Sequence, residues 1–299
     1  MEDVTRRSEE ILTQGPRNGA GGILQAAMGN SFKILVYVLL VIMAVIMIFP
    51  YIWMLSNSLK MKPEFYQFPY RLIPAEPVLT TYRFALEQGR ILLYMRNSAL
   101  YTISVIVIQL FFASLAAYAF AHVRFPGRET LFMALLATMM LPGTVTLIPN
   151  FLLVHYLGLT NTYLGVIIIS FAGAFGIFLL RQFFLNIPKE LGEAAYIDGA
   201  GFFTIYSRIM LPLAKPALIT LGVFIFLGEW NNFVWPLIVL SDSSKYPITV
   251  GIALFRNQHT TDWPAVFAAS TAVSFPAVLL FFLAQEYIVG GISLSGLKG

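Results

Sequence analysis

Two clusters of polar residues interrupt an otherwise apolar sequence, and they are the places where this chain could do chemistry or recognise a partner. The first lies between residues 193 and 212 and begins with the run Glu193-Ala194-Ala195. The second combines an acid, two amides and two tryptophans, and its members are Glu229, Trp230, Asn231, Asn232 and Trp235. Carboxylates and amides exchange hydrogen bonds, and alanines allow another surface to approach closely. Both clusters are therefore suited to recognition.

The sequence lacks the patterns that support catalysis, a metal or a bound nucleotide. It contains no Gly-Lys dipeptide, so the P-loop that cradles phosphates is absent. Its histidines, His122, His155 and His259, are far apart, no HExxH pair occurs, and there is no cysteine to hold zinc. No set of Ser, His and Asp stands out as a nucleophilic triad. We expect no enzyme activity, no metal and no cofactor on this chain.

The first cluster is predicted to lie on a short helix followed by a sharp turn. Pro188 suits the first turn of a helix because it has no N–H to leave unpaired. The helix dipole favours Glu190 in the same turn. Gly199 stands where a helix would end in the left-handed conformation. We predict one helix over 188–198 and a second from about Phe202 towards Pro212.

The elements that must position both clusters are membrane helices. Of the 299 residues, 58% are hydrophobic and only 11% are charged, whereas about 25% of the residues in a soluble domain are charged. Long uncharged runs, at roughly 20 residues per span, predict an all-α integral membrane protein with six transmembrane helices. Their expected ranges are 33–56, 97–121, 130–150, 162–183, 213–239 and 265–288.

An even number of spans places both termini on the same side of the membrane. A small excess of Lys and Arg there predicts that both are cytoplasmic, N-in and C-in, which puts the first cluster in the cytoplasm. Residues 1–32 are expected to be a poorly ordered cytoplasmic N-terminal arm, and 33–56 a true transmembrane helix rather than a signal peptide. We expect 57–96, rich in proline and aromatic residues, to be an ordered extracytoplasmic elbow, and 289–299 a cytoplasmic C-terminal tail.

Small residues recur at a spacing of four in two of the predicted spans. Ala113, Ala117 and Ala121 form one such stripe, and Ser170 with Ala174, or Ala172 with Gly176, forms another. Small residues on one face let membrane helices approach closely. The expected role is packing within this chain rather than an interface with another subunit.

Glu229 is the one ionisable residue inside a predicted span, and an acid in a membrane is a functional-site hypothesis by default. In one interpretation the second cluster lines a path for a solute. In the other, the helix has already reached the outer interface, where tryptophan and polar groups normally lie. Glu229 is about 20 Å beyond Pro216 at 1.5 Å per residue, in a hydrocarbon core about 30 Å thick. Both interpretations stay open.

The first cluster resembles the EAA motif of the membrane subunits of ATP-binding-cassette (ABC) importers. That pattern reads E-A-A, three residues, G, nine residues, I, one residue, L-P. Every place is filled here, by Glu193, Ala194, Ala195, Gly199, Ile209, Leu211 and Pro212. The second cluster and the run 287–291 resemble sugar-specific permeases of the maltose-type branch. This chain has Asn232 where that branch often has an acid, and its own acid precedes the tryptophan.

The resemblance implies a type I ABC importer permease-like bundle, with a permease domain over 90–288 and a coupling loop over 184–212. It implies that the motif residues, together with Asp198, couple this chain to an ATPase. ATP and Mg²⁺ are then expected on partner subunits. The implied partners are two ATPase subunits, a second and different permease subunit, an extracytoplasmic solute-binding protein and membrane lipid, with no nucleic acid.

The implied function is that of a multi-pass permease subunit in the cell (inner) membrane, importing a sugar or oligosaccharide delivered by a solute-binding protein. One alternative is ABC import of another solute, such as a polyol or sugar phosphate. A second is a secondary transporter that works alone. That class predicts several buried ionisable groups for ion coupling, and this chain offers one plausible candidate.

Overall fold

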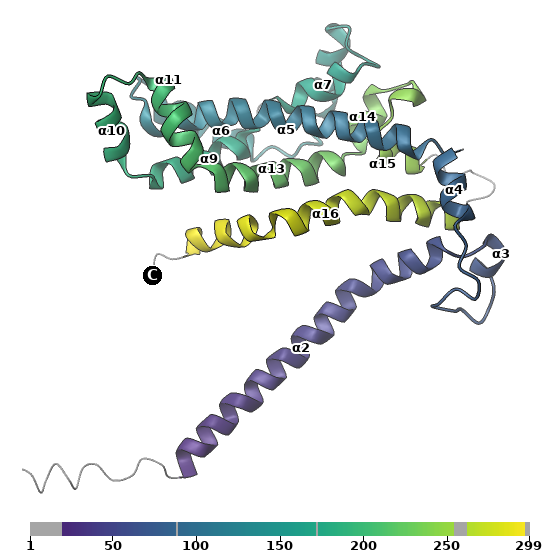
Figure 1. The fold of residues 1–299 in the computed structure, drawn as a ribbon. Coiled ribbons are helices and arrows are strands. Elements are labelled where there is room, and N and C mark those ends of the chain that lie inside the picture. The colour runs from purple at the N-terminus through teal and green to yellow at the C-terminus, as the bar shows by residue number, and fades with distance from the viewer. Residues whose placement is uncertain (1–19, 88, 172, 254–261, 297–299) are drawn as a thin grey trace, which may run out of the picture. The chain divides into compact units, whose positions relative to one another are not determined.

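The computed structural model describes residues 20–87, 89–171, 173–253 and 262–296, and all regular structure within them is helical (Figure 1). The chain divides between Met54 and Leu55 into two units, and each is described by itself. The elements are α2 (Ala20–Ser58), α3 (Lys62–Phe65), α4 (Thr80–Glu87), α5 (Ile91–His122), α6 (Arg128–Thr138), α7 (Leu147–Tyr156), α8 (Tyr163–Ile167), η1 (Ile168–Ser170), α9 (Ala174–Asn186), α10 (Lys189–Ile197), α11 (Phe202–Ile205), η2 (Tyr206–Met210), α12 (Leu211–Leu213), α13 (Lys215–Trp230), α14 (Val234–Val239), η3 (Ser243–Lys245), α15 (Ile248–Ala253) and α16 (Trp263–Gly296).

The part of the first unit that the structure describes, residues 20–54, belongs entirely to the apolar helix α2. Every side chain from Phe32 to Ile52 is exposed, as suits a surface that faces lipid. The helix begins at Ala20, so the prediction of a poorly ordered arm over 1–32 is wrong from that residue onward. No charged residue and no proline lies between positions 20 and 32, so nothing local ends the helix. Residues 1–19 of the predicted arm lie outside the described residues.

The segment between α2 and α5 is ordered and contains the short helices α3 and α4. Lys60 is buried, and its ammonium group donates hydrogen bonds to Oδ1 of Asn57 (2.9 Å) and to the carbonyl of Arg71 (2.6 Å). The ring of Phe65 lies 5.8 Å from the ring of Phe267 on α16. This ring contact holds the segment, which belongs to the second unit, against α16. Helix α5 begins six residues before the span predicted from 97.

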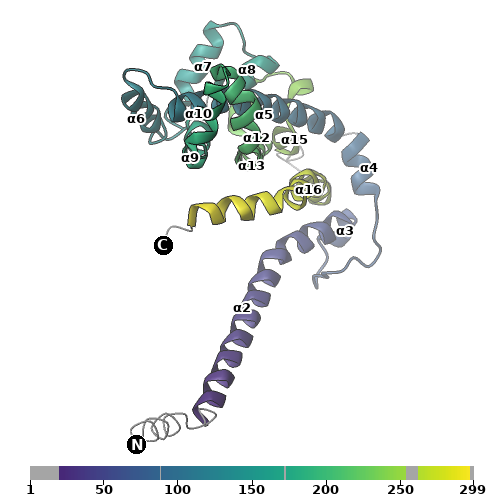
Figure 2. The same ribbon diagram turned by 60° about the vertical axis from the view of Figure 1, so that its left-hand side comes forward.

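In the second unit, α5 is the central helix, and α9 and α13 pack along it (Figures 1 and 2). Ala113, Ala117 and Ala121 are buried in the core that these helices share. A Cβ added to Gly176 on α9 would lie 3.4 Å from the Cβ of Ala113. The predicted packing role is confirmed for these four residues, and Ala172 lies outside the described residues. Helix α16 packs along α13.

Three of the predicted spans are interrupted. The helix expected over 130–150 is divided into α6 and α7, because Pro142-Gly143 breaks the helical pattern between them. The span expected over 162–183 consists of α8, η1 and α9. The span expected over 213–239 is divided into α13 and α14 by the turn that starts at Asn231.

By length and composition, three described helices can each cross a membrane: Phe32–Ser58, Ile91–His122 and Trp263–Glu286. Two pairs of shorter helices, each bent by more than 40° at a short break, raise that number to five if each pair counts as one span. The predicted all-α membrane fold is confirmed. The described helices account for three to five of the six predicted spans, and the segment 130–150 is not a continuous span because it is split.

Candidate functional site

The first polar cluster forms a short helix with a tight C-terminal turn. Helix α10 begins directly after Pro188. At its end the N–H of Gly199 donates to the carbonyl of Tyr196 (3.0 Å), and the N–H of Ala200 donates to the carbonyl of Ala195 (2.9 Å). This pair of bonds is a Schellman turn. Gly199 has φ = 85°, which residues with a Cβ rarely adopt. The predicted helix and its glycine stop are confirmed.

Helix α10 packs against a π-helical turn, η2, in the second half of the same motif. A Cβ on Gly192 would lie 3.2 Å from Cε of Met210 at the end of η2. Gly192 therefore allows α10 to approach this turn closely. In the sequence, the one sign of such a packing role is that a glycine lies inside a short predicted helix. The second predicted helix is built from α11, η2 and α12, after which the chain bends by 76° into α13. Single π turns of this kind are frequent at functional sites.

Tyr206 fixes the π turn to α5. Its hydroxyl lies 2.7 Å from Oγ of Ser114, and both side chains are buried. Ser114 itself donates to the carbonyl of Phe111 (3.0 Å), so Tyr206 is the donor in the pair. The ring of Tyr206 also lies 5.4 Å from that of Tyr118. Residues 189–213, from α10 to α12, form the α10 segment, and this bond ties it to the central helix α5.

Much of the α10 segment faces outward, and no residue of α10 is buried. Among the predicted coupling residues, the exposed ones are Glu193, Ala194, Asp198, Gly199 and Pro212, and the half-buried ones are Ala195, Ile209 and Leu211. Large apolar side chains beside them are also exposed, notably Ile197 (84%) and Phe203 (69%). Exposed apolar groups gathered in one place mark an interaction surface.

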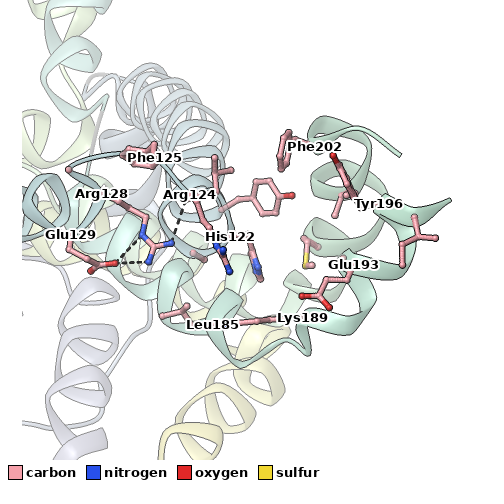
Figure 3. Close-up of a pocket in the computed structure, with 18 of the residues that line it drawn as sticks. His122, Arg124, Phe125, Arg128, Glu129, Leu185, Lys189, Glu193, Tyr196 and Phe202 are labelled. Atoms are coloured by element: carbon pink, nitrogen blue, oxygen red, sulfur yellow. Dashed lines mark hydrogen bonds and ion pairs between the residues drawn. The ribbon is translucent and has the colours of Figure 1, made fainter. Parts of the chain in front are cut away.

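A cavity of about 1320 Å³ lies between the end of α5 and α10 (Figure 3). On the α5 side it is lined by His122 and Arg124, and on the α10 side by Lys189 and Glu193. Figure 3 shows the side chains of His122 and Arg124 directed into this space. Glu193, Tyr196 and Ile197 line this cavity and are also exposed residues of α10.

The second polar cluster centres on the carboxylate of Glu229, near the end of α13. Its Oε1 accepts a hydrogen bond from the hydroxyl of Ser170 (3.0 Å), and its Oε2 accepts one from Nδ2 of Asn232 (3.3 Å). Gln109 on α5 donates from Nε2 to the carbonyl of Ser170 (2.5 Å). Glu229 and Asn232 are half-buried, and Asn231 is exposed. The cluster joins α5, the end of η1 and the break after α13.

The depth of this cluster follows from its contact with α5. Gln109 lies thirteen residues before His122, the last residue of this 32-residue helix, or about 20 Å from the end at 1.5 Å per residue. Through Ser170, Glu229 is therefore linked to the middle of α5, and both interpretations of the second cluster stay open. The first cluster lies at the His122 end, so the structure does not bring the two clusters together.

Both tryptophans of the second cluster are buried. Trp230 is 5% exposed and donates from Nε1 to the carbonyl of Val273 on α16 (3.1 Å). Trp235 is 4% exposed and donates to the carbonyl of Val166 on α8 (3.2 Å). Their indole groups bind neighbouring helices. Ser170, predicted only as a small packing residue, and Gln109, which the sequence did not single out, belong to the polar cluster.

A further polar network ties the segment after α14 to the opposite end of α5. Asn97 donates from Nδ2 to the carbonyls of Ser244 (2.8 Å) and Tyr246 (3.0 Å). Oδ1 of Asn161, a residue with φ = 56°, accepts from the N–H of Asp242 (3.0 Å). Asp242 in turn accepts from the N–H of Ser244 (2.9 Å). Within the residues described, no group of three or more His, Asp or Glu is placed to hold a metal ion.

Residues 109–293 match the model of a family described as "Binding-protein-dependent transport system inner membrane component". The chain is 32% identical over 272 residues to the diacetylchitobiose uptake system permease protein NgcG of Streptomyces coelicolor, covering 90% of each chain. It is 33% identical over 259 residues to the arabinooligosaccharides transport system permease protein AraQ of Halalkalibacterium halodurans, covering 86% of this chain and 93% of that protein. A chain in the crystal structure of a bacterial ABC transporter involved in the import of the acidic polysaccharide alginate is similar in fold, with a TM-score of 0.78 and 27% identity over 91% of this chain and 99% of that one.

Proposed function

We infer the function from the family: this chain belongs to the inner membrane components of binding-protein-dependent transport systems, and we propose that it is the permease subunit of an ATP-driven importer for a sugar or oligosaccharide. The observation that carries the proposal is α10, an E-A-A helix with no buried residue, ended by a left-handed glycine. The proposal places ATP, Mg²⁺ and their hydrolysis on separate ATPase subunits.

The names of several relatives support a sugar as the solute. They are permeases for diacetylchitobiose and arabinooligosaccharides, and a trehalose/maltose permease of Thermococcus litoralis is 32% identical over 272 residues. The fold neighbour belongs to a transporter involved in alginate import. All of these solutes carry many hydroxyl groups, which hydrogen-bond to carboxylates and amides.

The Glu229 cluster is the part of this chain best suited to such a solute. It brings together the carboxylate of Glu229, the amides of Asn232 and Gln109, and the hydroxyl of Ser170. These groups come from the middle of α5, the end of η1, and the end of α13 with the break that follows it. Interrupted helices in membrane proteins occur where the backbone faces a cavity or a path. We propose that Glu229, Asn231 and Asn232 contact the solute, and that the buried Trp230 and Trp235 hold the wall of the path in shape.

The coupling role is proposed for α10 and the turn that follows it. The exposed face offers Glu193 and Asp198 for ion pairs, and Ala194 for close approach of a partner surface. The Schellman turn and the Tyr206–Ser114 bond link this face to α5 without a flexible joint. Closure of an ATPase dimer would then move the permease helices as rigid bodies. A second permease subunit and a solute-binding protein complete the proposed assembly.

The test of the solute path is the double variant Asn231→Leu/Asn232→Leu in the complete transporter. Each lost hydrogen bond to a solute is worth about 0.5–1.5 kcal/mol, so uptake should fall roughly 5- to 150-fold for two bonds while the ATPase subunits still copurify. Gln67→Leu is the control, because Gln67 is an exposed amide residue between α2 and α5 and lies outside both polar clusters. Uptake in the double variant equal to that of the control would refute the proposed path.

A further inference from the structure

The cavity between the end of α5 and α10 has basic side chains on opposite walls. Arg124 follows α5 directly, and Lys189 is the first residue of α10. Figure 3 shows Arg124 and His122 on one wall, with Lys189 and Glu193 across the space. The cavity volume of about 1320 Å³ is ample for a group the size of a phosphate ester.

The charges in this lining do not cancel. Arg128 forms an ion pair with Glu129 (2.8 Å), and Glu129 also pairs with Arg181 (3.2 Å). Arg124 and Lys189, by contrast, form no ion pair or hydrogen bond with any residue that the structure describes. The remaining acid of the lining is Glu193, so two unmatched cations face one carboxylate. The lining therefore carries net positive charge, which an anionic ligand would neutralise.

The position of the cavity indicates where that anion comes from. Helices α5 and α9, which belong to two candidate membrane spans, both end beside it, at His122 and Asn186. In a bilayer this is the depth at which helices leave the hydrocarbon and meet lipid headgroups. Apolar side chains, Phe125 and Leu185 among them, also line the cavity and suit the glycerol and acyl ends of a lipid. Basic pockets between membrane helices are known to bind anionic headgroups.

We propose that this cavity binds the phosphate headgroup of an anionic membrane lipid, held between Arg124 and Lys189. Because Lys189 lies on α10 and Arg124 directly follows α5, a bound headgroup bridges the proposed coupling helix to the central membrane helix. Anionic lipid would then stabilise the position of α10. Uptake and ATP hydrolysis by the complete transporter should rise with the anionic lipid content of the bilayer.

The test uses the complete transporter in nanodiscs of phosphatidylcholine with a minor fraction of phosphatidylglycerol. Native mass spectrometry measures how much phosphatidylglycerol each complex retains. A basic residue near an anionic membrane surface contributes about fivefold in affinity, so Arg124→Gln/Lys189→Gln should lower the retention affinity about 30-fold. The charge-keeping Arg124→Lys/Lys189→Arg should retain phosphatidylglycerol, which separates loss of charge from misfolding. Lys62→Gln/Arg83→Gln, exposed bases outside the cavity, is the matched control.

Three results would overturn the proposal. In the first, the Gln variant retains as much phosphatidylglycerol as the Lys62/Arg83 control. In the second, inorganic phosphate displaces the retained lipid or raises activity in pure phosphatidylcholine, which assigns the site to a free anion. In the third, the Gln variant loses its ATPase subunits while lipid retention is unchanged, which assigns the cavity to an acidic side chain of the partner.

Discussion

Gly199 is the residue whose replacement most directly tests how α10 is held. Its φ of 85° places it in the left-handed region, and a Cβ built there would meet no atom within 4 Å. A larger side chain would therefore cost free energy through the backbone alone, without a clash in this chain. That cost is about 1–2 kcal/mol for a residue with a Cβ, which lowers the population of the closed turn by roughly 5- to 30-fold.

Two variants separate this backbone effect from the effect of size. Valine is branched at Cβ and poorly tolerated at positive φ, whereas asparagine visits that region readily. In proteoliposomes that contain the complete transporter, Gly199→Val should lower coupled uptake roughly 5- to 30-fold, and Gly199→Asn should stay near the wild-type rate. Membrane levels of both variants should be normal, because the turn lies outside the spans. Equal activity of the two variants, whether both normal or both impaired, would refute the reasoning, since φ would then not be the deciding property.

Three further predictions concern contacts elsewhere in the second unit. Gly192→Leu should weaken ATPase copurification, because overpacking against the π turn costs about 1–3 kcal/mol, whereas Gly192→Ala should need only a small shift of a flexible methionine; equal copurification of both variants would contradict this. Tyr206→Phe and Ser114→Ala should each lower thermal stability by about 0.5–1.5 kcal/mol, and the double variant by little more than either, since the two hydroxyls pair with each other; fully additive losses would contradict the pairing. Hydrogen bonds from Ser244 lower the pKa of Asp242 below its ordinary 3.8. The ionised carboxylate therefore stabilises the fold above pH 3.8, and this contribution is lost as the pH falls through the lowered pKa. Asp242→Asn should make stability depend less on pH in this acid range, and an unchanged acid unfolding profile would contradict the prediction.

The sequence was sufficient for the features that local chemistry decides. A proline at the first turn and a glycine at the end fixed the bounds of α10 and its left-handed stop, because both residues restrict φ directly. Composition and uncharged runs were enough to predict an all-α membrane protein. The spacing of alanines on α5 predicted a packed face, which the contact with Gly176 confirms.

Contacts between distant residues could not be predicted in the same way. Ser170 and Glu229 are 59 residues apart, and Ser114 and Tyr206 are 92 apart. Nothing in the local pattern says that these polar atoms meet, since each lies in an apolar run with its own periodicity. The packing of the helices brings each pair of polar atoms together: η1 and α13 place Ser170 beside Glu229, and η2 on α5 places Tyr206 beside Ser114.

The interrupted spans show a second limit, which is that a run of uncharged residues does not reveal where a helix breaks. Pro142-Gly143 lies inside the run predicted as one span over 130–150, and the structure ends α6 before it and begins α7 after it. Trp230 and Trp235 illustrate the same limit for side chains. From sequence, an indole near polar groups fits a solute path, an interface or a buried hydrogen bond equally well. In the structure both indole N–H groups donate to buried carbonyls, those of Val273 and Val166.

Docking of the α10 segment on an ATPase subunit can be tested by site-specific cross-linking. The chain has no cysteine, so a single cysteine at the exposed Ile197 or Phe203 can be probed without background. In complexes that retain uptake, a short bifunctional thiol reagent should link Ile197→Cys and Phe203→Cys to an ATPase subunit that carries a surface cysteine. Leu79→Cys, 70% exposed in the segment between α2 and α5, should give no such product. Absence of the product at both α10-segment positions, or its appearance at residue 79 alone, would contradict the account.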